Sequence, residues 1–490
     1  MSFSRALRPQ VLLSICLPLV LAASAPAAPC QRSAAAAPPP RVRPNVLLIV
    51  ADDLAAGALG AYGNLQCRTP AVDGLAARGM RFDRAYCQFP VCGPSRVALL
   101  SGLYPRTAGV MDNGQAELWA SRDDLPPTFP QLFRASGWQT TRISKIFHMR
   151  VPGDITAGVN GADHGASWDR RFNCKAPEWQ TPGSSRHLGR GKLKMDPDKH
   201  YDLGFGTAFY VVEGKGNGAE QADDQAASRA IQVLQEERDH PFFLAVGFVR
   251  PHVPLVAPES YYAPYAAEDM ALARSVENDA DDIPKLGRSR TSVDFGLTAP
   301  SKQRQVLRAY YASVSYMDAQ VGRILEALDT TGQTDNTIVI FTSDHGYHLG
   351  EHDFWQKLSL HEESARIPLV LAGPGVEVGT TGSLAQQIDL YPTLADMAEL
   401  DIPAHLQGKS LAPVLANPAT EVHDHVYCGM RSGHMLRTTR YAFLRWEDGS
   451  VELYDMLQDP LQFRNRAGDA DLAPVEIDLS RRLDTLTGSF

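Results

Sequence analysis

Short, uninterrupted runs of apolar residues recur along the chain and are separated by longer amphipathic segments. The runs are NVLLIVA at residues 45–51, PFFLAVGF at 241–248, TIVIFT at 337–342 and IPLVLA at 367–372. Apolar runs of this length, bounded by proline, glycine or acidic residues, are typical of strands that are buried on both faces. Weaker runs at 80–86 and 139–143 predict two further strands.

The segments between these runs carry helical spacing. Helices are predicted at residues 69–79, 95–100, 128–137, 221–238 and 303–328. In the longest of them Val306, Tyr310, Val314 and Met317 share one face, as an amphipathic helix requires. Strands that alternate with helices in this way predict an α/β layer fold with a large, mostly parallel sheet between helix layers.

Two regions and the C-terminus depart from this alternation. Residues 150–218 and 258–301 show no clear period, so we expect loops and insertions over the edge of the sheet. From about residue 421 short alternating segments are separated by turns, and a final helix is expected near 474–486. We therefore predict a main domain at 44–415 and a smaller C-terminal subdomain at 416–490, built on an antiparallel sheet and a helix.

The N-terminus has the features of a processing signal. Arg5 and Arg8 precede an apolar stretch at 11–23, and small residues follow it. We predict a signal peptide at 1–28 and a low-complexity tether at 29–43, so the protein is exported, either to the periplasm or out of the cell. A membrane anchor is the alternative, although the apolar stretch is short for a span, and Pro29 before Cys30 fits a lipoprotein signal poorly.

Composition excludes some classes of function. The 490 residues include 47 Lys and Arg against 56 Asp and Glu, which gives a formal net charge of −9. This balance argues against a general nucleic-acid binder but permits an anionic substrate in a local cationic pocket. Once the signal is removed, no transmembrane span is expected.

Acidic and histidine side chains follow three of the predicted strands. Asp52 and Asp53 follow the first, His252 comes just after the second, and Asp344 and His345 follow the third. Ligands bind at the carboxyl ends of strands in open α/β sheets. Three carboxylates with an imidazole suit a hard cation, and Ca²⁺ tolerates irregular oxygen coordination better than Mg²⁺ does. Taken alone, Asp52 and Asp53 are equally well explained as the cap of a following helix.

A single cysteine stands where another helix begins. In the segment CGPSR, Cys92 precedes Pro94 and Ser95, which open a helical pattern, and helix N-termini favour anions. A buried cysteine without chemistry is the alternative. The cationic candidates elsewhere would suit a sulfate or phosphate group; they are Arg96, Lys145, His148, His252 and Lys357.

These residues resemble the type I, formylglycine-dependent sulfatase family. Its signature Cys-x-Pro-Ser-Arg is matched at Cys92–Arg96 and continues to Leu100-Ser101-Gly102, and its C-terminal LYD…DP segment is similar to residues 453–460. Within the family the chain looks most like iduronate 2-sulfatase and its bacterial relatives. That similarity lies in FFLAVGFVRPH at 242–252, YASVSYMDAQVG at 311–322 and FTSDHGYHLGEHDFWQK at 341–357. The resemblance covers nearly the whole mature chain and implies an alkaline-phosphatase-like fold.

The resemblance implies a role for each candidate. Cys92 would be converted to formylglycine (3-oxoalanine) by a formylglycine-generating enzyme during maturation. One calcium ion would be held by the modified Cys92 and four further ligands, Asp52, Asp53, Asp344 and His345. Arg96 and Lys145 would hold the aldehyde hydrate and the sulfate, and Asp344 would also help to deprotonate the attacking hydroxyl. His252 and Lys357 would help the alcohol to leave, and His148 would take the proton that releases sulfate.

The implied activity is hydrolysis of a sulfuric ester on a sulfated carbohydrate, such as a glycosaminoglycan-like or other polysaccharide fragment. Residues 150–218 and 258–301 do not follow iduronate 2-sulfatase, so recognition of a uronate cannot be carried over. Two alternatives stay open at this point. One is a phosphodiesterase or phosphonate monoester hydrolase of the same superfamily, and the other is a catalytically silent protein that binds sulfated glycans.

Overall fold

The computed structural model describes residues 43–122, 124–190, 193 and 208–490. The predicted signal peptide and the predicted tether up to residue 42 lie outside these residues. Arg43–Phe490 form one folded unit, and the proposed boundary at residue 415 stays a prediction. No helix in the described part of the chain is long and apolar enough to cross a membrane.

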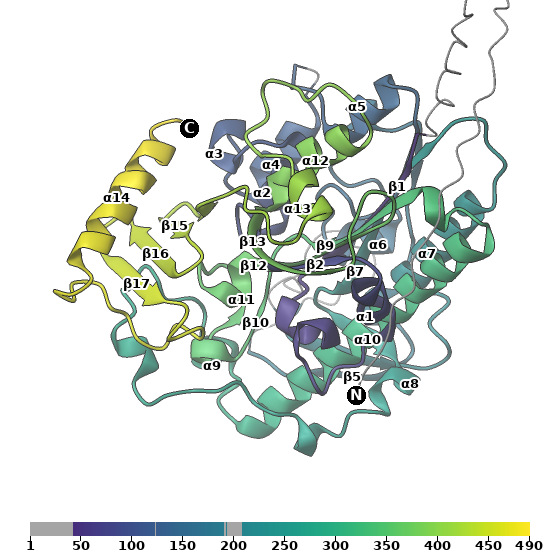
Figure 1. Ribbon diagram of the computed structural model, residues 1–490. Helices are drawn as coiled ribbons and strands as arrows, with labels where there is room; N and C mark the ends of the chain where they lie inside the picture. Colours follow the sequence, from purple (N-terminus) through teal and green to yellow (C-terminus); the bar gives the residue numbers. More distant parts are fainter. Residues whose placement is uncertain (1–42, 123, 191–192, 194–207) are drawn as a thin grey trace, which may run out of the picture. The chain divides into compact units, whose positions relative to one another are not determined.

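A large mixed sheet forms the centre of this unit (Figure 1). Its strand order is β13-β2-β12-β9-β1-β7-β3-β4. The central strand β1 runs parallel to β7 and β9, whereas β12 is antiparallel to β9 and β2. The predicted mostly parallel sheet is therefore confirmed. The strands are β1 (Asn45–Asp52), β2 (Met80–Tyr86), β3 (Gln139–Ser144), β4 (Arg170–Phe172), β7 (Phe242–Pro251), β9 (Thr337–Ser343), β12 (Arg366–Ala372) and β13 (Gly379–Gln386).

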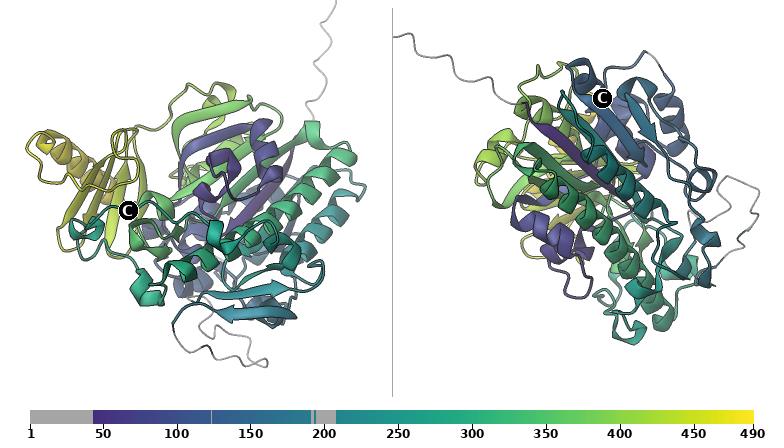
Figure 2. Two further views of the ribbon diagram at one scale, coloured as in Figure 1. Left: turned by 90° about the horizontal axis from the view of Figure 1, so that it is seen from below. Right: turned by 90° about the vertical axis from the view of Figure 1, so that its right-hand side faces the viewer.

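Helices cover both faces of this sheet (Figure 2). On β1, Leu47 and Ile49 point into a core shared with one helix layer, while Val46 and Leu48 point into the core on the opposite face. Because both faces are buried, the strand is apolar at successive positions and does not alternate. The first layer contains α1 (Pro70–Ala77), α7 (Ala222–Leu234) and α10 (Pro300–Thr330); the second contains α2 (Cys92–Ser101), α4 (Asn113–Ala120), α5 (Phe129–Ala135) and α12 (Leu390–Met397).

A smaller antiparallel sheet and a helix end the chain, as predicted. The sheet contains β14 (Val426–Gly429), β15 (Gly433–Arg437), β16 (Tyr441–Trp446) and β17 (Val451–Asp455), in that order. The final helix α14 (Ala473–Thr487) packs on it through Leu479 and Leu483. Leu436, Phe443 and Leu453 supply the other side of this small core, which accounts for the alternating pattern seen in the sequence.

The regions expected to be loops contain regular structure. β4 extends the main sheet, and β5 (Gly183–His187), β6 (Tyr210–Gly214) and β8 (Leu255–Pro258) form a separate sheet. The sequence of β5, GSSRH, is largely exposed and has no apolar alternation, so periodicity could not indicate it. β13 was missed because glycine and threonine fill its first half. The remaining short elements are α3 (Pro105–Ala108), α6 (Gly153–Ala157), α8 (Glu259–Tyr262), α9 (Ser292–Phe295), α11 (Glu362–Ala365), α13 (Ala412–Ala416), β10 (His348–Leu349) and β11 (Trp355–Gln356).

One close backbone approach fixes the segment that follows β3. A Cβ atom on Gly247 in β7 would lie 1.9 Å from the carbonyl oxygen of Lys145. No side chain fits in that space, and glycine therefore lets the chain carrying Lys145 cross directly over β7.

Replacing this glycine tests how rigid the crossing is. Gly247→Ala should lower the free energy of unfolding by at least about 2 kcal/mol, because backbone atoms must shift to admit the methyl group. Gly74→Ala in α1 is the matched control, since its Cβ meets nothing within 4 Å and should stabilise the helix by up to about 1 kcal/mol. Urea denaturation of both variants measures the difference, and equal effects would contradict the close approach.

Candidate active site

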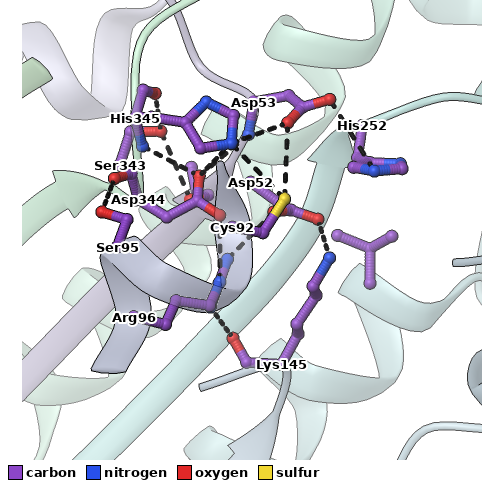
Figure 3. Close-up of polar contacts among 12 residues, drawn as sticks. Asp52, Asp53, Cys92, Ser95, Arg96, Lys145, His252, Ser343, Asp344 and His345 are labelled. Atoms are coloured by element: carbon purple, nitrogen blue, oxygen red, sulfur yellow. Dashed lines mark hydrogen bonds and ion pairs between the residues drawn. The ribbon is translucent and has the colours of Figure 1, made fainter. Parts of the chain in front are cut away.

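The carboxyl ends of β1, β3, β7 and β9 meet the start of α2 at one point inside the unit (Figure 3). Cys92 is the first residue of α2 and is only 2% exposed. Its Sγ lies 3.4 Å from His345 Nε2, 3.2 Å from Lys357 Nζ and 3.9 Å from Asp53 Oδ1. The structure therefore places the cysteine among three residues that are distant in the sequence.

Three carboxylates gather beside this thiol. Asp52, Asp53 and Asp344 each offer an oxygen within 4.8 Å of the other two. The backbone N–H of Asp53 donates to Asp344 Oδ1 at 3.2 Å, which links the ends of β1 and β9. Tyr310 on α10 donates its hydroxyl to the carbonyl oxygen of Asp53 at 2.7 Å and so holds the turn after β1 in place.

A buried arginine joins the strand ends to one another. Arg96 Nε donates to Asp344 Oδ2 at 3.0 Å, and its Nη2 donates to Asp52 Oδ1 at 3.1 Å. Its Nη1 donates to the carbonyl oxygen of Lys145 at 2.6 Å, while Lys145 Nζ forms an ion pair with the second oxygen of Asp52. Arg96 lies one turn after Cys92 on α2, so the helix, β1, β3 and β9 are held by a single side chain.

Cationic neighbours keep Asp52 and Asp53 ionised. Burial alone would raise the pKa of Asp52, but interactions with Lys145, His252 and Arg96 outweigh it and hold that pKa well below its ordinary value. Burial also opposes ionisation of Asp53, and interactions with His252 and Lys357 bring its pKa below the ordinary value. Lys357 stays charged in turn, because Asp53 raises its pKa against the effect of burial.

One carboxylate oxygen in this group has no partner. Asp53 Oδ2 is buried and accepts no hydrogen bond from the described residues, and the nearest ion-pairing atom, His252 Nε2, is 3.8 Å away. A buried carboxylate oxygen without a donor is costly. Carboxylate oxygens of this number and irregular arrangement fit a Ca²⁺ ion, which accepts six to eight oxygen ligands.

Two histidines complete the surroundings. His252 Nδ1 lies 2.6 Å from the carbonyl oxygen of Val253, which can only accept, so Nδ1 carries the proton and Nε2 faces Asp53. Burial and the charge of Lys145 lower the pKa of His148 well below its ordinary value, so its imidazole is neutral. Among the described residues no hydrogen bond or ion pair joins His148 to Cys92, and His148 Nδ1 has no partner.

Other residues support the site without having been predicted. Ser95 Oγ contacts the carbonyl oxygen of Asp344 and lies 2.7 Å from Gln387 Oε1. Gln387 Nε2 donates to the carbonyl oxygen of Ser343 at 2.9 Å, so both side chains hold the turn after β9. Gln387 follows β13, the strand that the sequence did not indicate, and Tyr310 stood in the apolar pattern of a helix. Nothing in the sequence pattern distinguished either of them.

The central role of Arg96 leads to a stability prediction. Arg96→Met removes one buried ion-pair partner from both Asp52 and Asp344 and should lower the free energy of unfolding by about 3–5 kcal/mol. Arg78→Met is the control, because the ion pair of Arg78 with Asp329 is exposed and should contribute no more than about 0.5 kcal/mol. Both values come from denaturant titration, and a loss for Arg96→Met as small as that of the control would show that the carboxylates are not held by this arginine.

Comparison with known proteins places the chain in a family. The family model Sulfatase matches residues 44–400, and the model N-sulphoglucosamine sulphohydrolase, C-terminal, matches residues 350–489. A sulfatase of Formosa agariphila is 30% identical over 448 residues, with 87% of this chain and 83% of the relative covered. Iduronate 2-sulfatase of Homo sapiens is 32% identical over 403 residues, with 73% and 70% covered.

A solved structure shows the same fold. Phosphonate monoester hydrolase of Agrobacterium radiobacter superposes with a TM-score of 0.73, at 24% sequence identity and with 91% of this chain and 96% of that chain covered. Identity at this level speaks for the shared alkaline-phosphatase-like fold and does not choose between substrates. The family model, by contrast, matches most of the chain, and the relatives named above are sulfatases. The chain therefore belongs to the sulfatase family and is a sulfuric ester hydrolase.

Proposed function

We propose that this sulfatase removes sulfate from a sulfated carbohydrate, such as a fragment of a glycosaminoglycan-like or other polysaccharide. The observation that carries the proposal is the convergence of carboxylates and cationic side chains on one residue, Cys92. The similarity to iduronate 2-sulfatase, whose name specifies a sugar acid, supports a carbohydrate substrate.

The nucleophile is formylglycine made from Cys92. The Cys-x-Pro-x-Arg segment supports this modification, and the thiol sulfur marks where the oxygens of an aldehyde hydrate lie in the mature enzyme. A hydrate supplies one hydroxyl that attacks sulfur and a second whose deprotonation releases sulfate. Because Cys92 is 2% exposed, the formylglycine-generating enzyme must act on this segment before the chain folds.

A calcium ion completes the site. Asp52, Asp53, Asp344 and His345 hold it together with residue 92, and the unpartnered oxygen of Asp53 supports this assignment. When bound, Ca²⁺ offsets the negative charge of the carboxylates and withdraws charge from the sulfate oxygens.

The remaining side chains handle charge and protons. Lys357 Nζ lies 3.2 Å from Cys92 Sγ and binds an oxygen of the sulfate ester. Lys145, whose Nζ forms an ion pair with Asp52, also binds the sulfate. Arg96 orients Asp52 and Asp344, and Asp344 accepts the proton of the attacking hydroxyl. His252 Nε2 faces the site and, when it also carries a proton, donates to the departing alcohol, while the neutral imidazole of His148 is suited to accept the proton that releases sulfate.

The enzyme works outside the cytoplasm. The signal-like segment at 1–28 and the proline-rich tether support export to the periplasm or the medium. Polysaccharide substrates are found in those compartments, so the proposed location and the proposed substrate agree.

Sulfate release tests the activity. Protein co-expressed with a formylglycine-generating enzyme should carry an aldehyde at position 92 by mass spectrometry and release sulfate from defined sulfated mono- and disaccharides. Cys92→Ala should lower the rate by about a thousandfold or more because it removes the nucleophile. Cys92→Ser retains one hydroxyl, so it should release at most one alcohol per enzyme and remain sulfated.

Two results would overturn this proposal. One is full activity in protein whose Cys92 is an unmodified thiol. The other is faster turnover of an aryl phosphodiester or a phosphonate monoester than of every sulfate ester in the screen, which would favour the phosphonate monoester hydrolase alternative.

Metal removal tests the calcium site without relying on activity. Chelation should lower the melting temperature of the wild-type protein, and Ca²⁺ should restore it, because a ligand at about 100 times its Kd stabilises the folded state by about 2.7 kcal/mol. Asp53→Asn should abolish most of this response, whereas Asp329→Asn at an exposed ion pair should keep it. A melting temperature that is unaffected by both chelator and Ca²⁺ would contradict the site.

A further inference from the structure

A second pocket lies beside the residue that follows Lys357. It has a volume of about 550 Å³, and its described lining residues are Arg190, Arg288, Ser289, Arg290, Asp294, Phe295 and Leu358. Ser289 donates its hydroxyl to the carbonyl oxygen of Lys357 at 3.2 Å, and the backbone N–H of Trp355 donates to the carbonyl oxygen of Arg290 at 2.9 Å. Residues 288–290, which carry two of the pocket arginines, therefore lie next to residues 355–358, the segment from which Lys357 Nζ enters the active site.

The pocket has a surplus of positive charge. Three arginines line it, and Asp294 is the one carboxylate among its described lining residues. Within the described part of the chain no carboxylate forms an ion pair with Arg190, Arg288 or Arg290. Arg308 elsewhere, by contrast, forms an ion pair with Glu213. In a protein with a net charge of −9, this local surplus favours an anionic ligand.

Contacts with neighbouring residues restrain the three arginines. The backbone N–H of Arg190 donates to the carbonyl oxygen of Phe295 at 2.6 Å, and the stem of Arg190 packs against Gly296, where a Cβ would lie 2.4 Å from Arg190 Cγ. Arg290 lies over the Phe295 ring at 6.0 Å, and Arg288 Nε donates to the carbonyl oxygen of Ile283. Restrained side chains lose less conformational entropy when they bind.

We propose that this basic pocket binds a second anionic group, a sulfate or a carboxylate, on the same carbohydrate whose sulfate ester reacts at residue 92. The inference rests on the proposed function and narrows its substrate to carbohydrates with several negative charges. Guanidinium groups bind such groups through paired N–H donors. Leu358 lines the pocket and directly follows Lys357, and Ser289 binds the carbonyl oxygen of Lys357, so the pocket adjoins the segment that carries Lys357.

The test uses full-length protein that carries the aldehyde. Sucrose octasulfate serves as the polyanionic probe, and its affinity is measured by calorimetry at low and at moderate salt. Replacing all three arginines by glutamine (R190Q, R288Q and R290Q together) should weaken binding at least tenfold and reduce its salt dependence. The kcat/KM for 4-nitrophenyl sulfate should change by less than twofold, because a substrate with one charge does not reach the pocket.

Two further variants serve as controls. Arg481→Gln removes an arginine that is 75% exposed on α14 and should leave the affinity for sucrose octasulfate unchanged. Asp294→Asn removes the carboxylate from the pocket while leaving a side-chain acceptor for the N–H of Thr291, so it should tighten binding several-fold. This gain of affinity cannot come from misfolding, which guards against a variant that merely fails to fold.

The outcomes separate this inference from the proposed function. If the triple variant bound sucrose octasulfate with wild-type affinity, the assignment of the pocket as an anion-binding site would be overturned, even if the enzyme released sulfate normally. A protein with the aldehyde that releases no sulfate from any ester would overturn the proposed function instead, whatever the binding data show.

Discussion

The site depends on keeping three carboxylates charged inside the protein at close range. Two unit charges 4 Å apart repel by about 4 kcal/mol at an effective dielectric constant of 20, and Asp52, Asp53 and Asp344 approach one another at about this range. Arg96 and Lys145 offset the repulsion around Asp52 and Asp344, but one oxygen of Asp53 keeps no partner. The protein thus balances most of this charge by itself, and the proposed Ca²⁺ ion would offset the rest.

This balance requires the strand ends to be held at fixed distances, which explains much of the fold around them. The residues of β1 are buried on both faces, so the strand cannot shift without disturbing two cores. Gly247 lets the Lys145 segment cross β7 at backbone distance, and Arg96 then binds the carbonyl oxygen of Lys145. The packing that stabilises the sheet therefore also positions the charges.

The sequence predicted the strands and site residues for which residue type and position in the chain indicate the same structure. Apolar runs predicted the buried strands, and Asp52, Asp53 and Asp344 were selected because they follow such runs. Residues whose contribution comes only from tertiary contact were not predictable: Gln387 follows a strand rich in glycine and threonine, and the hydroxyl of Tyr310 acts from an otherwise apolar helix face. Strand β5 was missed because an exposed edge strand needs no apolar alternation.

The charges of the active site and of the arginine pocket differ in how they are compensated. At the active site Arg96, Lys145 and Lys357 each contact a carboxylate. These contacts fix the positions of the carboxylates and keep the pKa values of Asp52 and Asp53 low. In the pocket the described lining residues include three arginines and one aspartate, so positive charge is in excess there. The paired charges lie at the ends of buried strands, whereas the uncompensated ones lie in segments that sequence periodicity could not assign. Under the proposed assignment, chemistry and substrate selection would reside in different parts of the fold, so the second could change while the first is kept.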